Sequence, residues 1–214
     1  MNKKIIKTNI IIIAIVILIL MGCFAIRTLS SSFTAADCPY NIKFTQVAYG
    51  GDSKAETVLA IDTDGHLWTW GRDWTSYMSA SPISTVPLQV TNNNRFKQVS
   101  GSYALDVNGN VWEISKTTLT QRSSGISFKK ISANNSAEDN YCLAIDNSNN
   151  LYSYGTNNNG QLGNGNTTDK NGGRQANHTS FIKVKTGIKD VSAAGTHALA
   201  IDTSNNLYAW GSCV

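Results

Sequence analysis

Four aspartates recur along the chain in one local setting, each after a short apolar stretch and before a short polar one. They are Asp62, Asp106, Asp146 and Asp202, separated by 44, 40 and 56 residues. Carboxylates are common groups for acid–base catalysis and for binding hard cations. An Asp side chain also accepts hydrogen bonds from the backbone of its own turn, which explains why the same position holds Asp each time. We therefore expect these aspartates to be structural, with no metal ion and no cofactor.

Histidines and cysteines are the other side chains with reactive atoms. The histidines are His66, His178 and His197, and the cysteines after residue 36 are Cys38, Cys142 and Cys213. None of them forms a Cys-x-x-Cys pair or another metal-ligand spacing. Nucleophile-elbow and His-Glu-x-x-His signatures are also missing from the sequence. The sequence thus predicts no enzymatic activity, and the cysteines are either buried and free or form one disulfide with a thiol left over.

The elements around each aspartate form a strand–turn–strand unit. An apolar strand ends at the Asp, and the strand after the turn carries aromatic residues at every second position, so that they share one face. These aromatic pairs are Trp68 and Trp70, Tyr152 and Tyr154, and Tyr208 and Trp210. The turn contains Gly65 or Gly109 in the first two units, which is a strong hairpin signal. Asn149 and Asn205 take that position later, and Asn tolerates the same left-handed conformation.

A further short strand is expected ahead of each hairpin. Apolar and polar residues alternate at 44–47, 96–99, 128–131 and 188–191. Each unit therefore holds at least three strands in hairpin order, and no helical periodicity follows residue 36. The sequence predicts an all-β fold made of about four copies of one repeat.

Two segments carry a resemblance to a known family. Residues 191–202 with 207–211, and the loop Gly160-Gln-Leu-Gly163, resemble the repeat of the RCC1 family (regulator of chromosome condensation). The resemblance covers about 43–214; the first two copies lack the Gly-Gln-Leu-Gly loop, and Ser115 replaces a Gly after the aromatic strand. Besides the four aspartates, the repeat positions are Gly65, Gly71, Gly109, Gly155, Gly160, Gly163 and Gly211.

The resemblance implies a β-propeller of four-stranded blades, usually seven of them. This chain offers about four, so an incomplete propeller with open strand edges is expected. Three interpretations follow: the chain is a fragment of a longer protein, several arcs self-associate to complete a propeller, or the arc closes as a small ring. The resemblance also gives Gly160 and Gly163 a tight turn between strands.

The first 36 residues read as a separate targeting segment ahead of a repeat domain at 37–214. Lys3, Lys4 and Lys7 precede an unbroken apolar run, Ile10–Ile26, of 17 residues. Such a segment is a membrane-spanning helix or a signal peptide, and the lysines predict that the following domain faces away from the cytoplasm. Retention as an anchor, acylation at Cys23 and cleavage after Ala36 are the three alternatives.

The charge of the chain argues against a nucleic-acid partner. The formal net charge is +4, from 18 basic and 14 acidic residues. The first 36 residues hold four of the basic side chains and no acidic one, so the remainder is neutral. A neutral domain lacks the basic surface that binding to phosphates requires.

A membrane-tethered, extracytoplasmic protein-binding module is the function that the sequence favours. The segment after the first aromatic strand departs from the repeat and contains Asp73, Trp74 and Tyr77. Exposed Trp and Tyr anchor protein interfaces, although these two rings would pack equally well between blades. The alternatives are a degenerate fragment with no independent activity, and, by family analogy, a guanine-nucleotide-exchange-like regulator, which export disfavours. The sequence does not name the protein partner.

Overall fold

The computed structural model describes residues 42–52, 55–72, 82–135, 140–165 and 178–212. All of these except residue 42 belong to a compact unit that begins at Lys43. These described residues form fifteen strands and no helix, so the predicted all-β class is confirmed. No helix among them is long and apolar enough to cross a membrane. The predicted membrane or signal segment at 1–36 lies outside the described residues.

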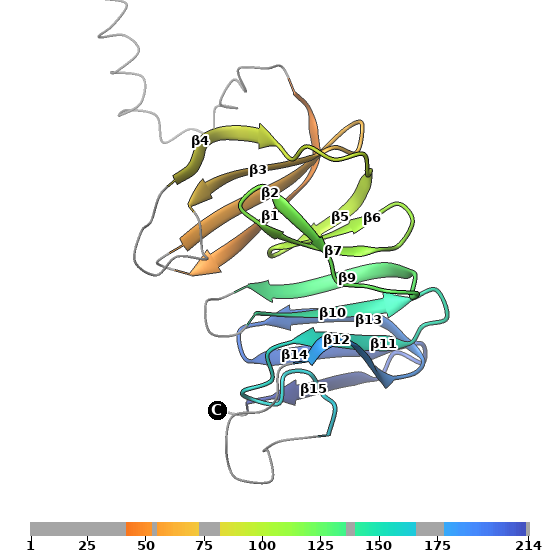
Figure 1. Cartoon of the computed structure of the whole chain (residues 1–214). Coiled ribbons are helices and arrows are strands. Elements are labelled where there is room, and N and C mark those ends of the chain that lie inside the picture. The colour runs from red at the N-terminus through yellow and green to blue at the C-terminus, as the bar shows by residue number, and fades with distance from the viewer. Residues whose placement is uncertain (1–41, 53–54, 73–81, 136–139, 166–177, 213–214) are drawn as a thin grey trace, which may run out of the picture. The chain divides into compact units, whose positions relative to one another are not determined.

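The strands form four antiparallel sheets in chain order (Figure 1). Sheet 1 consists of β1 (Phe44–Asp52), β2 (Ala55–Asp62), β3 (Leu67–Arg72) and β4 (Pro82–Gln89). Sheet 2 consists of β5 (Phe96–Ser100), β6 (Tyr103–Asp106), β7 (Val111–Ser115) and β8 (Thr118–Gln121). Each strand pairs with the next along the chain, so each sheet is a meander.

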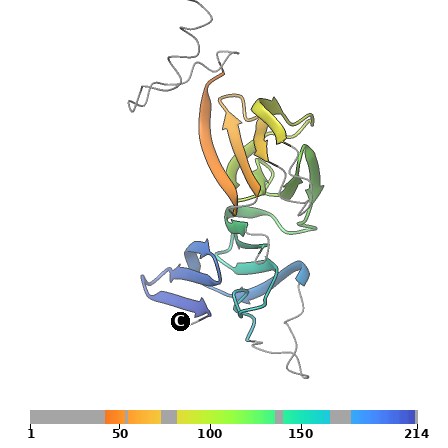
Figure 2. The ribbon, with the colours of Figure 1, turned by 90° about the vertical axis from the view of Figure 1, so that its left-hand side faces the viewer.

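Sheets 3 and 4 repeat the arrangement toward the C-terminus, in the green-to-blue part of the chain in Figure 2. Sheet 3 consists of β9 (Phe128–Asn135), β10 (Asn140–Asp146), β11 (Leu151–Gly155) and β12 (His178–Lys185). Sheet 4 has three strands among the described residues, β13 (Ile188–Ala194), β14 (His197–Asp202) and β15 (Leu207–Gly211). The first three strands of every sheet are those that the sequence predicts.

The hairpin turn after each aspartate needs one residue in the left-handed backbone region. Gly65 and Gly109 have φ values of 81° and 90°, and Asn149 and Asn205 have 62° and 70°. Asn is the side chain that adopts this conformation most readily, because its short amide makes local hydrogen bonds there. The expected replacement of Gly by Asn therefore keeps the turn.

The hydrophobic core is divided among the junctions between sheets. Three buried clusters join sheets 1 and 2, sheets 2 and 3, and sheets 3 and 4. In the last of these, Leu143, Ile145 and Leu151 of sheet 3 meet Ile188 and Val191 of sheet 4. We call the face of a sheet that packs on the following sheet its downstream face, and the opposite one its upstream face. Alternation along each strand supplies one set of side chains to each face.

Polar side chains also connect successive sheets. The Gln98 amide of sheet 2 donates to the Ile131 carbonyl of sheet 3 at 2.8 Å and accepts from the Ile131 N–H at 2.9 Å. Ser100 and Ser132 accept hydrogen bonds from the backbone N–H of Ala133 and Ala193 on the following sheets, both at 2.9 Å. These contacts fix the register of each sheet on its neighbour.

Candidate functional site

The repeated aspartates bind the backbone of their own turns. Asp62 Oδ1 accepts from the N–H of Asp64 at 2.9 Å and of His66 at 2.8 Å. Asp146 and Asp202 make the same two bonds, at 2.9 and 2.8 Å each, to the N–H groups two and four residues later. One carboxylate oxygen thus satisfies two donors that the short turn leaves without backbone acceptors.

The second oxygen binds two side chains further along the hairpin. Asp62 Oδ2 accepts from His66 Nδ1 and from Trp68 Nε1, both at 2.9 Å. In the other copies the partner four residues on is an Asn amide, at 2.9, 2.7 and 2.9 Å. The partner six residues on is Trp112 Nε1 at 2.9 Å or Tyr208 OH at 3.1 Å. This link was not predicted from the sequence; its signal is an aromatic donor six positions after every repeated Asp.

Hydrogen bonding favours the ionised form of three of these carboxylates, those of Asp62, Asp146 and Asp202. Burial raises the pKa of Asp62, but the bonds from Trp68, His66 and Asp64 outweigh it, so the pKa lies below its usual value. The pKa of Asp146 is lowered in the same way, against the effect of burial, chiefly by Asn150. The pKa of Asp202 is lowered mainly by the side chain and backbone of Asn206. A permanently charged acceptor suits a turn anchor and does not suit a proton-transfer catalyst near neutral pH.

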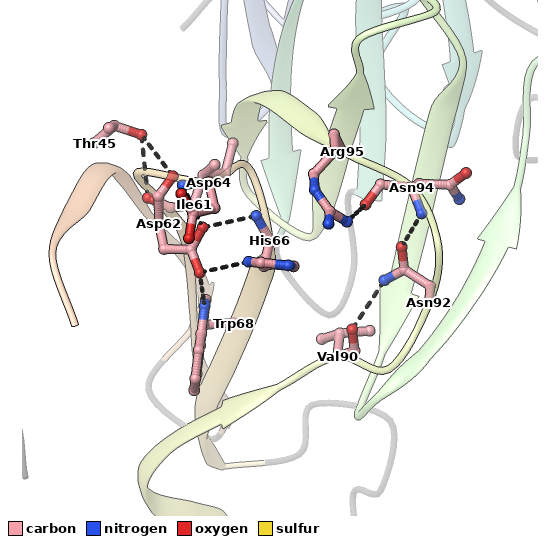
Figure 3. A network of polar contacts seen from close by, with 10 residues as sticks. All are labelled: Thr45, Ile61, Asp62, Asp64, His66, Trp68, Val90, Asn92, Asn94 and Arg95. Carbon is pink, nitrogen blue, oxygen red and sulfur yellow. Dashed lines mark hydrogen bonds and ion pairs between the residues drawn. The ribbon is translucent and has the colours of Figure 1, made fainter. Parts of the chain in front are cut away.

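Asp62, Asp64 and His66 are the one group among the described residues that has the composition of a metal site (Figure 3). Their ligand atoms lie within 4.8 Å of one another. However, both oxygens of Asp62 already accept two hydrogen bonds each. His66 stands where the other copies place an Asn amide that donates to the Asp. We therefore assign His66 as a donor through Nδ1–H, and the cluster as a hydrogen-bonded turn.

The connection from sheet 1 to sheet 2 is held beside this turn (Figure 3). Asn92 accepts from the Asn94 N–H at 2.7 Å and donates to the Val90 carbonyl at 2.9 Å. The Phe96 N–H donates to the Gly65 carbonyl at 2.8 Å, so the turn of sheet 1 contacts the first strand of sheet 2. The turn therefore positions the next repeat.

The loop containing Gly160 and Gly163 packs on the following sheet. Leu162 is fully buried in the cluster between sheets 3 and 4. Trp210 Nε1 of sheet 4 donates to the Gln161 carbonyl at 2.8 Å. A Cβ added at Gly163, where φ is 65°, would lie 2.7 Å from Trp210 Nε1. The glycine is thus needed for the close approach of the Trp210 ring.

The remaining sequence-predicted positions have varied outcomes. Gly155 and Gly211 are the last residues of β11 and β15, and Gly71 is the residue before the last in β3; their φ values are 109°, 108° and 106°. Asp73, Trp74 and Tyr77, proposed to bind a partner, lie outside the described residues.

Cys142 is free and fully buried, and burial, aided by the charge of Glu113, raises the pKa of its thiol far above the usual value. A thiol in this environment is not a nucleophile.

Comparison with protein families matches one part of the chain. Residues 148–201 match the family model of the regulator of chromosome condensation (RCC1) repeat. The E3 ubiquitin-protein ligases HERC2 of Homo sapiens and Mus musculus are each 29% identical over 103 residues, which are 48% of this chain and 2% of theirs. The similarity thus concerns a small portion of those ligases.

Solved structures share the fold over most of the described chain. Human WBSCR16 superposes with a TM-score of 0.59 at 15% identity, over 83% of this chain and 49% of that one. Yeast RCC1 (Prp20), in a complex with Kap60, gives a TM-score of 0.58 at 18% identity, over 78% of this chain and 43% of that one. The chain therefore spans about half or less of the length of the proteins that it resembles.

Proposed function

The chain is an RCC1-like repeat protein, and from that premise we propose that it is a protein-binding module without catalytic activity. The observation that carries the proposal is that the reactive side chains of the described residues have structural roles. The repeated carboxylates are saturated by turn donors, and the described thiol is buried. Among the described residues, hydrogen bonds hold the hairpin turns after the repeated aspartates. Repeat proteins commonly bind partners through loops carried on such a scaffold.

Relatives of the same fold support a protein partner. A structure of yeast RCC1 (Prp20) is a complex with Kap60, and Prp20p is described by its binding to Gsp1p and histones. Those partners belong to Prp20p. For this chain the neutral charge after residue 36 disfavours a nucleic-acid or chromatin surface.

The proposed contact surface is the segment between β3 and β4. It follows Arg72, the last residue of β3, and precedes Pro82, the first of β4. Trp74 and Tyr77 would supply apolar area at little cost in side-chain entropy, and Asp73 would add charge selectivity. This segment departs from the repeat, which suits a position selected for binding.

The module is proposed to face the outside of the cytoplasmic membrane. The supporting feature is the apolar run Ile10–Ile26 behind Lys3, Lys4 and Lys7. A reporter enzyme that is active only outside the cytoplasm, fused after Val214, is expected to be active. An active cytoplasmic reporter at the same position, with the exported one silent, would contradict this orientation.

Binding is tested with the full-length chain and two matched substitutions. Wild type immobilised in detergent is expected to capture one protein saturably from the extracytoplasmic fraction. Trp74→Ala is expected to weaken this binding at least tenfold, which is about 1.4 kcal/mol. Val86→Ala, a truncation at a side chain that is 39% exposed on β4, is the control and should bind as wild type does. Binding that is absent, or equal in all three proteins, would refute the proposal.

A further inference from the structure

Three apolar positions recur on the downstream face of each sheet, and their side chains are buried in sheets 1 to 3 but more exposed in sheet 4. The first position lies three residues before the repeated Asp, and the second lies one residue before it. The third position lies five residues after the Asp. In sheets 1 to 3 these side chains are at most 2% exposed: Leu59, Ile61, Leu67, Tyr103, Leu105, Val111, Leu143, Ile145 and Leu151. In sheet 4 the first and third positions are Leu199 at 43% and Leu207 at 67% exposed. Within the described residues, the downstream face of sheet 4 is therefore an open copy of a surface that is covered three times elsewhere.

A polar position on this face also recurs from sheet to sheet. Ser100 and Ser132 each accept a backbone N–H from the following sheet. Ser192 occupies the equivalent position in sheet 4 and lines one pocket together with Leu199 and Leu207. The face thus combines the apolar and the hydrogen-bonding features of the internal junctions.

The upstream face of sheet 1 shows the complementary feature. Val99, Ile131 and Val191, on the first strands of sheets 2 to 4, are 8%, 1% and 7% exposed because the preceding sheet covers them. Val47 is at the equivalent position of sheet 1 and is 69% exposed. Tyr49, two residues later on the same face, is 58% exposed. Large apolar side chains exposed together in this way mark an interaction surface.

We propose that the downstream face of sheet 4 binds the upstream face of sheet 1 of a second copy of this chain. The contact would reproduce the junctions already present between sheets 1 and 2, 2 and 3, and 3 and 4. In each of those junctions the downstream face is covered by a sheet whose first strand carries an aliphatic side chain, Val99, Ile131 or Val191. Sheet 1 carries Val47 at the same position, so sheet 1 of a second copy can cover the face of sheet 4 in the same way.

The number of sheets in two copies is compatible with a closed ring. A head-to-tail contact between unlike faces closes into a ring or grows into a filament. Two copies would bring together eight sheets, and propellers of about four to eight blades are the known range. A closed dimer would cover both open faces of both copies. The pairing goes beyond the proposed binding function and uses none of residues 73–81.

The experiment measures the mass of the full-length chain in detergent micelles at micromolar concentration. Wild type is expected to be a dimer. Leu207→Lys and Val47→Lys each alter one of the two faces at an exposed position, and each is expected to be a monomer. Val107→Lys is the matched control: Val107 is 54% exposed in the turn after Asp106, on neither face, so this variant should remain dimeric. Unchanged thermal melts would show that the variants fold.

Mixing the two face variants distinguishes the head-to-tail contact from other modes of association. A mixture of Leu207→Lys and Val47→Lys chains retains one intact pair of faces and is expected to form dimers. If the sheet 4 face paired with itself, Val47→Lys alone would remain dimeric, and if the sheet 1 face paired with itself, Leu207→Lys alone would remain dimeric. Either result would overturn the proposal. A wild type that is monomeric, or dimers that persist in both variants, would overturn it as well.

Discussion

Sheets 3 and 4 place the same residue type at the same repeat position in opposite environments. Leu151 and Leu207 both follow the repeated Asp by five residues, yet Leu151 is 1% exposed and Leu207 is 67% exposed. Their turns are alike, since Asn149 and Asn205 adopt the same left-handed conformation. The difference is the neighbouring sheet: sheet 4 covers Leu151. A repeat of this kind therefore encodes an interface rather than a core of its own.

The same comparison shows which features are intrinsic to a sheet. Asp146 and Asp202 make the same two hydrogen bonds to their turns, at equal distances, although Asn150 and Asn206 differ in their surroundings. The turn is thus set by local sequence, whereas burial of the downstream face depends on the next sheet. Substitutions at matched positions can separate these two contributions.

The largest effect is expected at the covered and open leucines. Leu151→Ala should lower the free energy of unfolding by about 2–5 kcal/mol, because it leaves a cavity between sheets 3 and 4. Leu207→Ala should change it by less than about 0.5 kcal/mol when the chain is dilute enough to be monomeric. Urea unfolding of the full-length chain measures both. Equal losses in the two variants would mean that Leu207 is covered within its own copy.

The second effect concerns the loop that sheet 3 places against sheet 4. Gly163→Ala adds a methyl group against the Trp210 ring, and we expect a loss of about 2–4 kcal/mol from overpacking and backbone strain together. Gly160→Ala is the control, since φ is 76° there but no atom lies within 4 Å of the added Cβ. It should show the backbone strain alone, about 1–2 kcal/mol. The nuclear magnetic resonance signal of the Trp210 indole N–H, compared in the two variants, reports whether the ring has moved.

A smaller effect is expected at the serines that join successive sheets. Ser132→Ala removes the acceptor of the Ala193 N–H and should cost about 1 kcal/mol. Ser192→Ala removes the equivalent hydroxyl from the open face of sheet 4 and should be close to neutral in the monomer. Hydrogen exchange at the Ala193 amide provides a local readout. If that amide exchanges no faster in Ser132→Ala, the bond does not hold the two sheets together.

Much of this architecture was predictable from the sequence. The four first strands begin at the expected residues, Phe44, Phe96, Phe128 and Ile188, because apolar side chains alternate there with polar ones. The fourth strands were implied by the resemblance to four-stranded blades, but no sequence pattern located them. β8 is mostly exposed and carries no such alternation, and it is joined to β7 through Lys116, a left-handed residue that no pattern announces.

The contacts between sheets were the part of the site that sequence reasoning missed. Gln98 and Ile131 are 33 residues apart, and nothing local in either segment indicates that they meet. The link from Asp62 to Trp68 spans six residues and recurs in every copy, so its spacing was visible. That this spacing serves a hydrogen bond follows only from the structure, in which the Trp68 indole N–H donates to the Asp62 carboxylate. The proposed binding residues Trp74 and Tyr77 stay predictions.

The smallest differences are expected in the pH dependence of the turns. Because the folded pKa values of Asp62 and Asp202 are lowered, the stability from these carboxylates is complete above the unfolded pKa, about 3.9, and is lost as the pH falls further. Asp62→Asn and Asp202→Asn should each make the free energy of unfolding depend less steeply on pH below this value. The change in slope corresponds to at most about one fewer proton bound on unfolding. Similar changes in the two variants would support a turn that forms independently of the neighbouring sheets. A change in Asp62→Asn alone would contradict it.

The central claim, that the open face of sheet 4 is a junction awaiting a second copy, is tested most directly by site-specific photo-crosslinking. A benzophenone side chain is introduced at position 207 of the full-length chain, and isotopically labelled and unlabelled copies are mixed before irradiation. The account predicts crosslinks between copies, from position 207 to the first strand of sheet 1 around Val47. Crosslinks confined to one copy, directed to the same face of the second copy, or formed only with a different protein would contradict it.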